Sequence, residues 1–469
     1  MDEKVLFKSK PPQQNPTTQA QSPVAAQSQP VKTSVEPQKK SKKPVLKIIL
    51  AIFAVIIIIF LVLLFIPKGA PKNVKLIWWG LWEEPQVVKP IIAEFEKENP
   101  NITVEYIKQD PKQYRERLTT RVNNNTGPDI FYFHNTWYPM IYNITSPLPS
   151  DVISADEFKK VFYSVIQKDL IKNGAIYGIP TGIDSISLFV NTDLLTAAGV
   201  KVPSNWDEFV KVSRSLTVKD EKGEIKTSGA ALGSYDNITH SADIISMLLA
   251  QQGVNFSKFS SFASDESDVL DFYTSFAKGD NNTWDNDLDS SILLFGQGKL
   301  AMYFGFSWDV FAIQSLNKDL KFEVYPVPSL FDRKATIVSY WVNGVSAKST
   351  HQNQAFLFMK FLSKKETAQK LFTESSKTRA FGTPYARIDL ADSLKENKII
   401  NPFVSQLPNA ASSFFASDTH DGDGGLNSSS NAYLSNAVNS MLLDESSPQT
   451  AVDTLDKGIA QILSKYAIK

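Results

Sequence analysis

Some of the eight tryptophans in this sequence stand beside side chains that can form hydrogen bonds. Trp82 directly precedes Glu83, and Trp341 lies two positions before Asn343. A flat aromatic ring can stack on the apolar C–H face of a sugar, while carboxylate and amide groups bind its rim of hydroxyls. Such a combination is what the binding of a sugar would require. The alternatives are a packed loop aromatic for Trp82, a solvated charge for Glu83 and a buried ring for Trp341.

Residues that many enzymes and metal sites need are scarce. The chain contains no cysteine, which excludes disulfides, cysteine-ligated zinc, a cysteine nucleophile and a lipidated N-terminal cysteine. Its four histidines form no HExxH motif, and there is no nucleotide-binding GxxxxGK[ST] motif. The acidic loop at 418–423 lacks the spacing of a calcium-binding EF-hand, which favours a flexible loop. We therefore expect no metal and no cofactor.

A glycoside hydrolase is the enzyme class that would share these aromatic and acidic residues. Its mechanism needs two carboxyl groups about 5–10 Å apart, one of them with a raised pKa. The 49 Asp and Glu residues are numerous, but no spacing in the sequence singles out a pair. We predict a binding protein rather than an enzyme, and an exported glycoside hydrolase remains the less favoured alternative.

Charge is divided unevenly along the chain. The 469 residues carry 49 Lys and Arg and 49 Asp and Glu, which argues against a strongly basic nucleic-acid-binding protein. Residues 1–66 have a net charge of +6, and residues 67–469 therefore have a net charge of −6.

A chain of this length is expected to form more than one globular unit.

An apolar run at 48–66 predicts one transmembrane helix over residues 45–67. Its 19 residues would span about 28 Å as a helix, close to the thickness of a bilayer's hydrocarbon core. A cleavable signal is the alternative, but 47 residues precede the run and no A-x-A-like site follows it, which favours an uncleaved anchor. Lysines concentrate on the N-terminal flank, so we predict a single-pass protein of the cell membrane with a cytoplasmic N-terminus and an extracytoplasmic binding domain.

The segment at 1–44 contains seven prolines and many Gln, Ser, Thr and Lys residues, but few large apolar ones. Such a composition cannot bury enough apolar surface to offset the entropy lost on ordering. We predict a disordered cytoplasmic tail, which is too short for a kinase or another signalling domain.

After the apolar run, the hydrophobic pattern alternates between strands and helices. Strand-like runs at 74–79, 102–107 and 129–133 are separated by helical spacing at 87–98 and 114–123. This order predicts an α/β unit with a mostly parallel sheet. Further strands are predicted at 176–180, 187–191, 300–304 and 322–328, and further helices at 206–216 (with Ser204 as N-cap), 242–252, 355–372, 433–443 and 449–466.

A series of motifs in a fixed order runs through residues 74–463. They are IWWGLWE (77–83), GPDI (127–130), NGAIYGIP (173–180), LFVNTDLL (188–195), AGV (198–200), PSNWDEF (203–209), FGQGKLAM (295–302), Trp308 and FGTP (381–384). This ordered set resembles the extracellular solute-binding proteins of ABC importers, family 1, the carbohydrate-binding branch that includes maltose-binding protein.

The resemblance implies an α/β, two-lobed periplasmic-binding-protein type II fold, here preceded by one transmembrane helix. Ligand would bind between the lobes, at the kind of crevice that α/β sheets favour. The family uses the tryptophan of PSNWDEF, here Trp206, for packing. The predicted N-terminal lobe comprises residues 73–180 and 328–363, and the predicted C-terminal lobe comprises residues 181–327 and 364–469.

The resemblance also implies further ligand contacts. In the family, the loop after the third strand contacts sugar, which here indicates Asn135 and Trp137. An acid often lies between the crossing strands, at Asp184, and a tryptophan lines the cleft at Trp308. Tyr433 aligns roughly with a family aromatic. The predicted ligand-binding residues are therefore Trp82, Glu83, Asn135, Trp137, Asp184, Trp308, Trp341 and Tyr433.

From this resemblance we expect a membrane-anchored solute-binding protein that captures a sugar or oligosaccharide and delivers it to an ABC transporter. Its partners would be the permease subunits, and we expect a monomer that binds no nucleic acid. Many family members are secreted or tethered through a lipidated cysteine, whereas a membrane helix would do the tethering here. A sensory or adhesion module without transport is the alternative, and some relatives bind polyol phosphates or peptides instead of sugars.

Overall fold

The computed structural model of the chain describes residues 73–279 and 282–466. The predicted tail at 1–44 and the predicted transmembrane helix at 45–67 lie outside these residues. Within the two described stretches, no helix is both long and apolar enough to cross a membrane.

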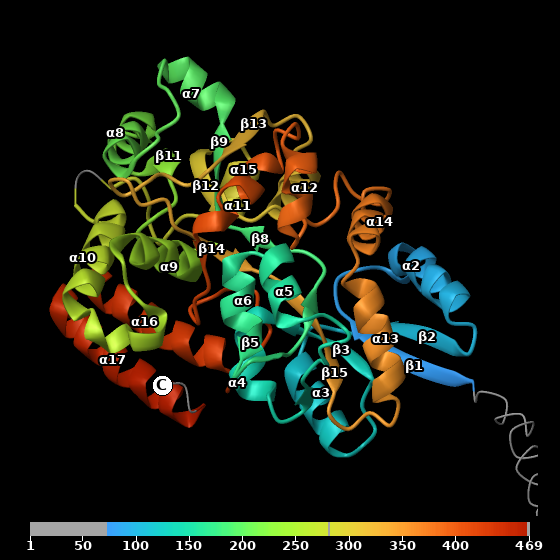
Figure 1. Cartoon of the computed structure of the whole chain (residues 1–469). Coiled ribbons are helices and arrows are strands. Elements are labelled where there is room, and N and C mark those ends of the chain that lie inside the picture. The colour runs from blue at the N-terminus through green and yellow to red at the C-terminus, as the bar shows by residue number, and fades with distance from the viewer. Residues whose placement is uncertain (1–72, 280–281, 467–469) are drawn as a thin grey trace, which may run out of the picture. The chain divides into compact units, whose positions relative to one another are not determined.

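The first sheet contains six strands in the order β2-β1-β3-β15-β4, with β7 also paired to β15. Figure 1 labels β1, β2, β3 and β15 of this sheet. The strands are β1 Val74–Gly80, β2 Ile102–Lys108, β3 Ile130–His134, β4 Thr145–Ser146, β7 Ile179–Pro180 and β15 Trp341–Ser346. β1 runs parallel to β2 and β3, whereas β15 runs antiparallel to β3, β4 and β7. Flanking helices are α2 Pro85–Glu98, α3 Tyr114–Asn123, α13 Gln352–Leu362 and α14 Lys365–Ser375.

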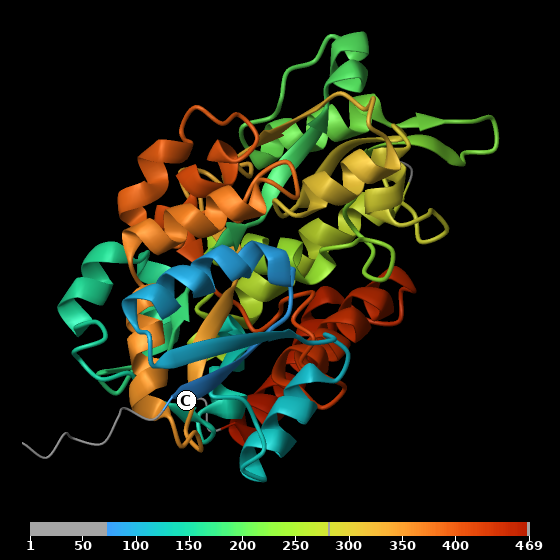
Figure 2. The ribbon, with the colours of Figure 1, turned by 90° about the vertical axis from the view of Figure 1, so that its right-hand side faces the viewer.

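The second sheet has the order β10-β11-β12-β9-β13. Its strands are β9 Ser187–Asn191, β10 Val218–Lys219, β11 Ile225–Ala230, β12 Leu300–Gly305 and β13 Phe322–Tyr325. Every residue of β9 and β12 is buried, as expected for central strands covered on both faces. Figure 2 shows the β10–β11 hairpin as a light green projection from this part of the molecule. The helices of this region include α7 Thr192–Ala198, α8 Trp206–Leu216, α9 Ser241–Gln252, α10 Ala263–Thr274, α11 Ser291–Gly296 and α12 Asp309–Leu316.

Two short strands connect the two sheets. β8 Asp184–Ser185 leads from β7 to β9, and β14 Thr336–Ser339 leads from β13 to β15. They pair with each other in antiparallel fashion, and β16 Ala410–Ala411 joins β14 in parallel. The remaining elements are η1 Asn135–Trp137, α4 Tyr138–Ile141, α5 Ala155–Val161, α6 Ser164–Leu170, β5 Ile171–Lys172, β6 Ala175–Ile176, η2 Phe256–Ser261, η3 Ser275–Ala277, η4 Ile388–Leu394, α15 Asn401–Ser405, η5 Leu407–Asn409, α16 Leu426–Leu442 and α17 Pro448–Lys465.

Several predicted boundaries were wrong for local reasons. The predicted strand at 176–180 is two strands, because β6 pairs with β5 whereas β7 pairs with β15. The strand predicted at 322–328 ends at Tyr325, ahead of Pro326 and Pro328, which have no N–H for a ladder. The predicted helix at 355–372 is divided between α13 and α14.

Separate packing explains the division of that helix. α13 packs against β15 and β1, whereas α14 packs against α2. Lys370 on α14 forms an ion pair with Glu94 on α2, with 2.5 Å between Nζ and Oε2. α14 therefore lies beside the first sheet, although the predicted boundary assigns residues 364–469 to the C-terminal lobe.

α8 begins at Trp206 as predicted, but its N-cap lies one residue from the predicted one. The N-cap is Asn205, not Ser204, because the Asn205 Oδ1 atom accepts the Glu208 N–H at 2.9 Å. Ser204 instead donates its N–H and its hydroxyl to the Glu208 carboxylate. Trp206 is buried and donates its indole N–H to Gln251 at 2.7 Å, so the packing role predicted for it is confirmed.

Candidate ligand-binding site

A cavity of about 500 Å³ lies where loops from the first sheet meet the connecting strands and the second sheet. Five of the predicted ligand-binding residues line it: Trp82, Glu83, Asp184, Trp308 and Trp341. The other lining residues are Tyr132, Thr181, Gly182, Ile183, Phe311, Ser339, Tyr340, Ala368, Leu371, Phe372, Ser375, Arg379, Thr383, Asp418 and His420.

Three tryptophans form part of the aromatic surface of the cavity, together with Tyr132, Phe311, Tyr340 and Phe372. Trp82 is 39% exposed, and its ring centroid lies 5.4 Å from that of Trp341 at a steep angle. Trp308 stacks on Phe306, with 4.3 Å between the centroids and 14° between the planes. Phe306 thus supports one face of Trp308, and the cavity has aromatic platforms contributed by separate elements.

The loop that carries Trp82 and Glu83 is positioned by the end of β1. A Cβ at Gly80 would overlap the ring of Tyr106 on β2, so only glycine permits this close approach. The Tyr106 hydroxyl then donates to the backbone carbonyl of Glu83 at 2.8 Å. This contact fixes the loop directly after the strand, where the sequence predicted a functional pair.

Glu83 is not a free acceptor, because it is paired with a cation. Arg379 donates from Nη2 to Glu83 Oε1 at 2.9 Å, and Ser375 donates to Oε2 at 3.3 Å. The same Nη2 atom also lies 2.9 Å from the Thr383 hydroxyl, and the guanidinium lies 5.6 Å from the ring centroid of Phe311. The cavity therefore presents an ion pair whose remaining lone pairs and N–H groups can bind hydroxyls.

Asp184 has a structural role that the sequence did not reveal. Its Oδ1 atom accepts the Ser185 N–H at 2.8 Å, and its Oδ2 atom accepts both the N–H (2.9 Å) and the hydroxyl of Ser307. Burial raises the pKa of Asp184 to about 7, although these hydrogen bonds oppose the rise. The carboxyl group joins β8 to the residue that precedes Trp308.

Three predicted residues do not line this cavity. The Asn135 amide donates to Asp169 at 3.2 Å and to Ser412 at 3.1 Å. Trp137 is fully buried and packs edge-on against Trp341, with 5.3 Å between the ring centroids. Tyr433 packs beside Gly458, where it fills the contact between α16 and α17.

Asn135 and Trp137 do not line the cavity because of the conformation of η1. The chain enters this 3₁₀ turn directly after β3, and both Asn135 and Trp137 are buried by it. Trp137 therefore packs against Trp341 from the interior of the protein. A sequence motif places residues on a loop, but it does not determine which side of the turn faces the cavity.

The sequence prediction missed Arg379, Asp418 and His420. Arg379 lies two residues before the quoted FGTP motif, and the other two belong to the acidic loop at 418–423. Asp418 and His420 both adopt the left-handed backbone conformation, with φ of 55° and 52°, and the His420 ring lies 5.4 Å from that of Trp82. A charged residue beside a family motif was the signal available for Arg379.

The lining of the cavity mixes aromatic and polar groups. Across residues 73–279 and 282–466, no cluster of His, Asp and Glu side chains could hold a metal ion. The lining combines tryptophan faces with carboxylate, guanidinium, hydroxyl and backbone groups. Such a surface suits a ligand that has both apolar faces and hydroxyl groups.

Comparison with known proteins gives a consistent assignment. Residues 80–369 match the family described as "Bacterial extracellular solute-binding protein". A Streptococcus mutans protein named "Multiple sugar-binding protein" is 24% identical over 313 residues, which are 62% of this chain and 71% of that protein. A Brucella abortus protein named as a "Putative binding protein" is 30% identical over 115 residues. These residues are 24% of this chain and only 28% of the Brucella protein.

Solved structures share the fold. A cyclo/maltodextrin-binding protein complexed with maltotetraose has a TM-score of 0.68 and 19% identity, over 84% of this chain and 99% of that one. The two-lobed α/β fold predicted from the sequence is therefore confirmed. The matched proteins are binding proteins and not enzymes, as predicted for this chain.

Proposed function

The chain belongs to the bacterial extracellular solute-binding proteins, and on that premise we propose that it captures a sugar or oligosaccharide and delivers it to an ABC transporter. The observation that carries this proposal is the cavity lined by Trp82, Trp308 and Trp341 beside the Glu83–Arg379 ion pair. Tryptophan rings stack on sugar C–H faces, and the ion pair supplies directional hydrogen bonds.

The proposed mechanism is lobe closure without chemistry. We propose one lobe around the first sheet and one around the second sheet, joined through β8 and β14, with α14 on the side of the first sheet because it packs against α2. Ligand that contacts both lobes stabilises the closed state, because only that state offers contacts from both sides. The closed form would then dock on the permease. Micromolar affinity, about −8 kcal/mol, is sufficient for this role.

A thermal-shift screen of the full-length protein against a carbohydrate panel tests the ligand class. A sugar at about 100 times its dissociation constant is expected to add about 2.7 kcal/mol to the free energy of unfolding, which raises the melting temperature. Mass spectrometry of the recovered sugar should show it unchanged. No shift with any sugar would contradict the proposal, and a shift with peptides or polyol phosphates alone would replace the ligand class.

We also propose that residues 45–67 anchor the protein in the cell membrane, with the binding domain on the extracytoplasmic face. The support is the uninterrupted apolar run at 48–66 and the lysines that precede it. In fractionated cells, the full chain is expected in the membrane fraction after a high-salt wash, and external protease should degrade the binding domain. Recovery of the full chain in the soluble fraction would contradict the anchor.

A further inference from the structure

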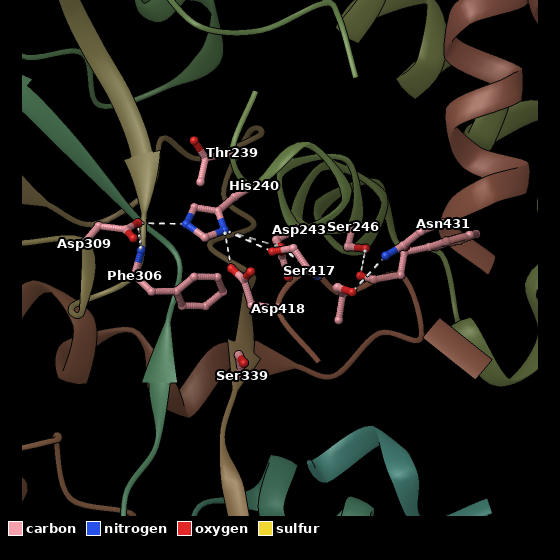
Figure 3. A network of polar contacts seen from close by, with 12 residues as sticks. Thr239, His240, Asp243, Ser246, Phe306, Asp309, Ser339, Ser417, Asp418 and Asn431 are labelled. Carbon is pink, nitrogen blue, oxygen red and sulfur yellow. Dashed lines mark hydrogen bonds and ion pairs between the residues drawn. The ribbon is translucent and has the colours of Figure 1, made fainter. Parts of the chain in front are cut away.

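A buried histidine lies behind the part of the cavity wall that carries Trp308. His240 directly precedes α9, and its side chain is fully buried. Its Nε2 atom lies 2.8 Å from Asp309 Oδ2, and its Nδ1 atom lies 3.0 Å from the Ser417 hydroxyl oxygen. Figure 3 shows the imidazole between Asp309 on one side and Asp243, Ser417 and Asp418 on the other.

The hydrogen-bond partners require a proton on Nε2. Asp309 Oδ2 accepts from the Tyr303 hydroxyl at 2.9 Å and from the Phe306 N–H at 3.0 Å. An ionised carboxylate is an acceptor only, so His240 must donate to it from Nε2.

The partners on the other side require a proton on Nδ1. Ser417 donates its hydroxyl and its N–H to the Asp243 carboxylate. The Ser417 oxygen is therefore left to accept a hydrogen bond from His240 Nδ1. With both ring nitrogens donating, His240 is an imidazolium cation.

Three carboxylates from different elements surround this cation. Asp309 begins α12, Asp243 is on α9 with its Oδ2 3.9 Å from Nδ1, and Asp418 is on the loop after β16 with its Oδ2 3.7 Å from Nδ1. Tyr303 on β12, which donates to Asp309, and Tyr235, which lies close to Asp243, are further titratable groups of this environment. Burial opposes protonation of His240, but the three carboxylates outweigh it and raise its pKa to about 9.

A second buried histidine shows that burial alone does not produce a cation. His134 is also fully buried, but its ring nitrogens contact the hydroxyls of Thr136 and Ser339 at 2.8 and 3.0 Å. Burial, with a smaller contribution from His420, lowers the pKa of His134 to about 3. The carboxylates around His240, which His134 lacks among these contacts, therefore explain why the pKa of His240 is raised while that of His134 is lowered.

The contacts of His240 connect two walls of the cavity. Asp309 follows Trp308 in the chain, and the Phe306 ring contacts both rings, with centroids 5.1 Å from His240 and 4.3 Å from Trp308. On the other side of the imidazole, Asp418 lines the cavity directly. Loss of the cation would leave three carboxylates around an uncharged ring, and their repulsion would displace Asp418 and Asp309.

We propose that His240, in its doubly protonated form, is a positioning residue that holds Trp308 and Asp418 in place for the ligand. This inference rests on the proposed function, because it assumes that the cavity binds a carbohydrate. It assigns to His240 a role in affinity that needs no contact with the ligand.

Calorimetric affinities between pH 7.5 and pH 10 test the inference on the full-length protein, with a sugar identified by the thermal-shift screen. Wild-type affinity is expected to fall about tenfold over this range, which corresponds to a loss of about 1.4 kcal/mol of binding free energy. His240→Gln is expected to bind about tenfold more weakly at pH 7.5 and to lose little more by pH 10. His351→Gln, which changes a half-exposed histidine outside the cavity, should behave as wild type.

Two readouts do not need a ligand and keep the inference testable if the screen fails or His240→Gln does not fold. Nitrogen NMR of labelled histidines in the wild type should show protons on both His240 nitrogens at pH 7.5, with His134 as the internal neutral reference. As the pH is raised, tryptophan fluorescence should change with the same pH midpoint as the titration of His240. This change should be absent in Trp308→Phe. Wild-type affinity in His240→Gln, a neutral His240 at pH 7.5, or unchanged fluorescence would overturn the inference.

Discussion

Replacement of Trp308 by alanine is expected to weaken carbohydrate binding by roughly 30-fold or more, which corresponds to about 2 kcal/mol. Trp308 lines the cavity and is supported across one face by Phe306, so the ring is held in a fixed orientation before the ligand arrives. A preorganised aromatic platform loses little entropy on binding, and its removal also leaves a void that water must fill. Isothermal calorimetry with the sugar found by thermal shift measures the effect.

Two further variants define the origin of this loss. Trp308→Phe retains a flat ring and should recover a large part of the affinity. Tyr142→Ala removes a 60% exposed aromatic that does not line the cavity, and it should bind as wild type. Equal affinity in Trp308→Ala and wild type would show that the ligand does not use this side of the cavity.

Replacement of Asp309 by alanine is expected to lower the free energy of unfolding by about 3–5 kcal/mol at pH 7, because it leaves a buried cation without its closest counter-ion. Asp309 Oδ2 accepts from His240, from the Tyr303 hydroxyl and from the Phe306 N–H. All three donors would lose their acceptor at once. Denaturant unfolding followed by circular dichroism measures the change, and Asp309→Asn serves if the alanine variant does not fold.

The effect has a defined pH dependence. The pKa of His240 is raised to about 9 in the folded protein, above its ordinary value of about 6.5. The folded state therefore binds the proton more tightly, so this stabilisation is complete below pH 6.5 and is lost as the pH rises through 9. In the wild type, the free energy of unfolding should fall by roughly 2–4 kcal/mol over this rise in pH. His351→Gln should retain this slope, and an unchanged slope in Asp309→Ala would contradict the assigned pairing.

Local patterns in the sequence predicted individual elements well. The helical spacing at 114–123 and 206–216 and the strand at 187–191 coincide with α3, α8 and β9. The division between α13 and α14 was not predicted, because the apolar spacing does not show that the two parts pack on different neighbours.

Five of the eight predicted site residues line the cavity, and two of them, Asp184 and Trp308, were predicted from the family resemblance. Trp82 and Glu83 directly follow β1, and Trp341 begins β15, and all three line the cavity. Asn135 and Trp137 also follow a strand, but η1 turns them inward. Arg379 reaches the cavity through its ion pair with Glu83, a contact between residues nearly 300 positions apart that periodicity cannot reveal.

The order of strands in the first sheet determines when that sheet can form during synthesis. β15 lies between β3 and β4 and also pairs with β7, yet residues 181–340 separate it from β7 in the chain. The ribosome must therefore complete residue 346 before the first sheet has its full set of partners. Until then β3, β4 and β7 lack their common neighbour, and such long-range pairing slows folding. An exported domain gains time for translocation from this arrangement, because its first sheet remains incomplete until late in synthesis.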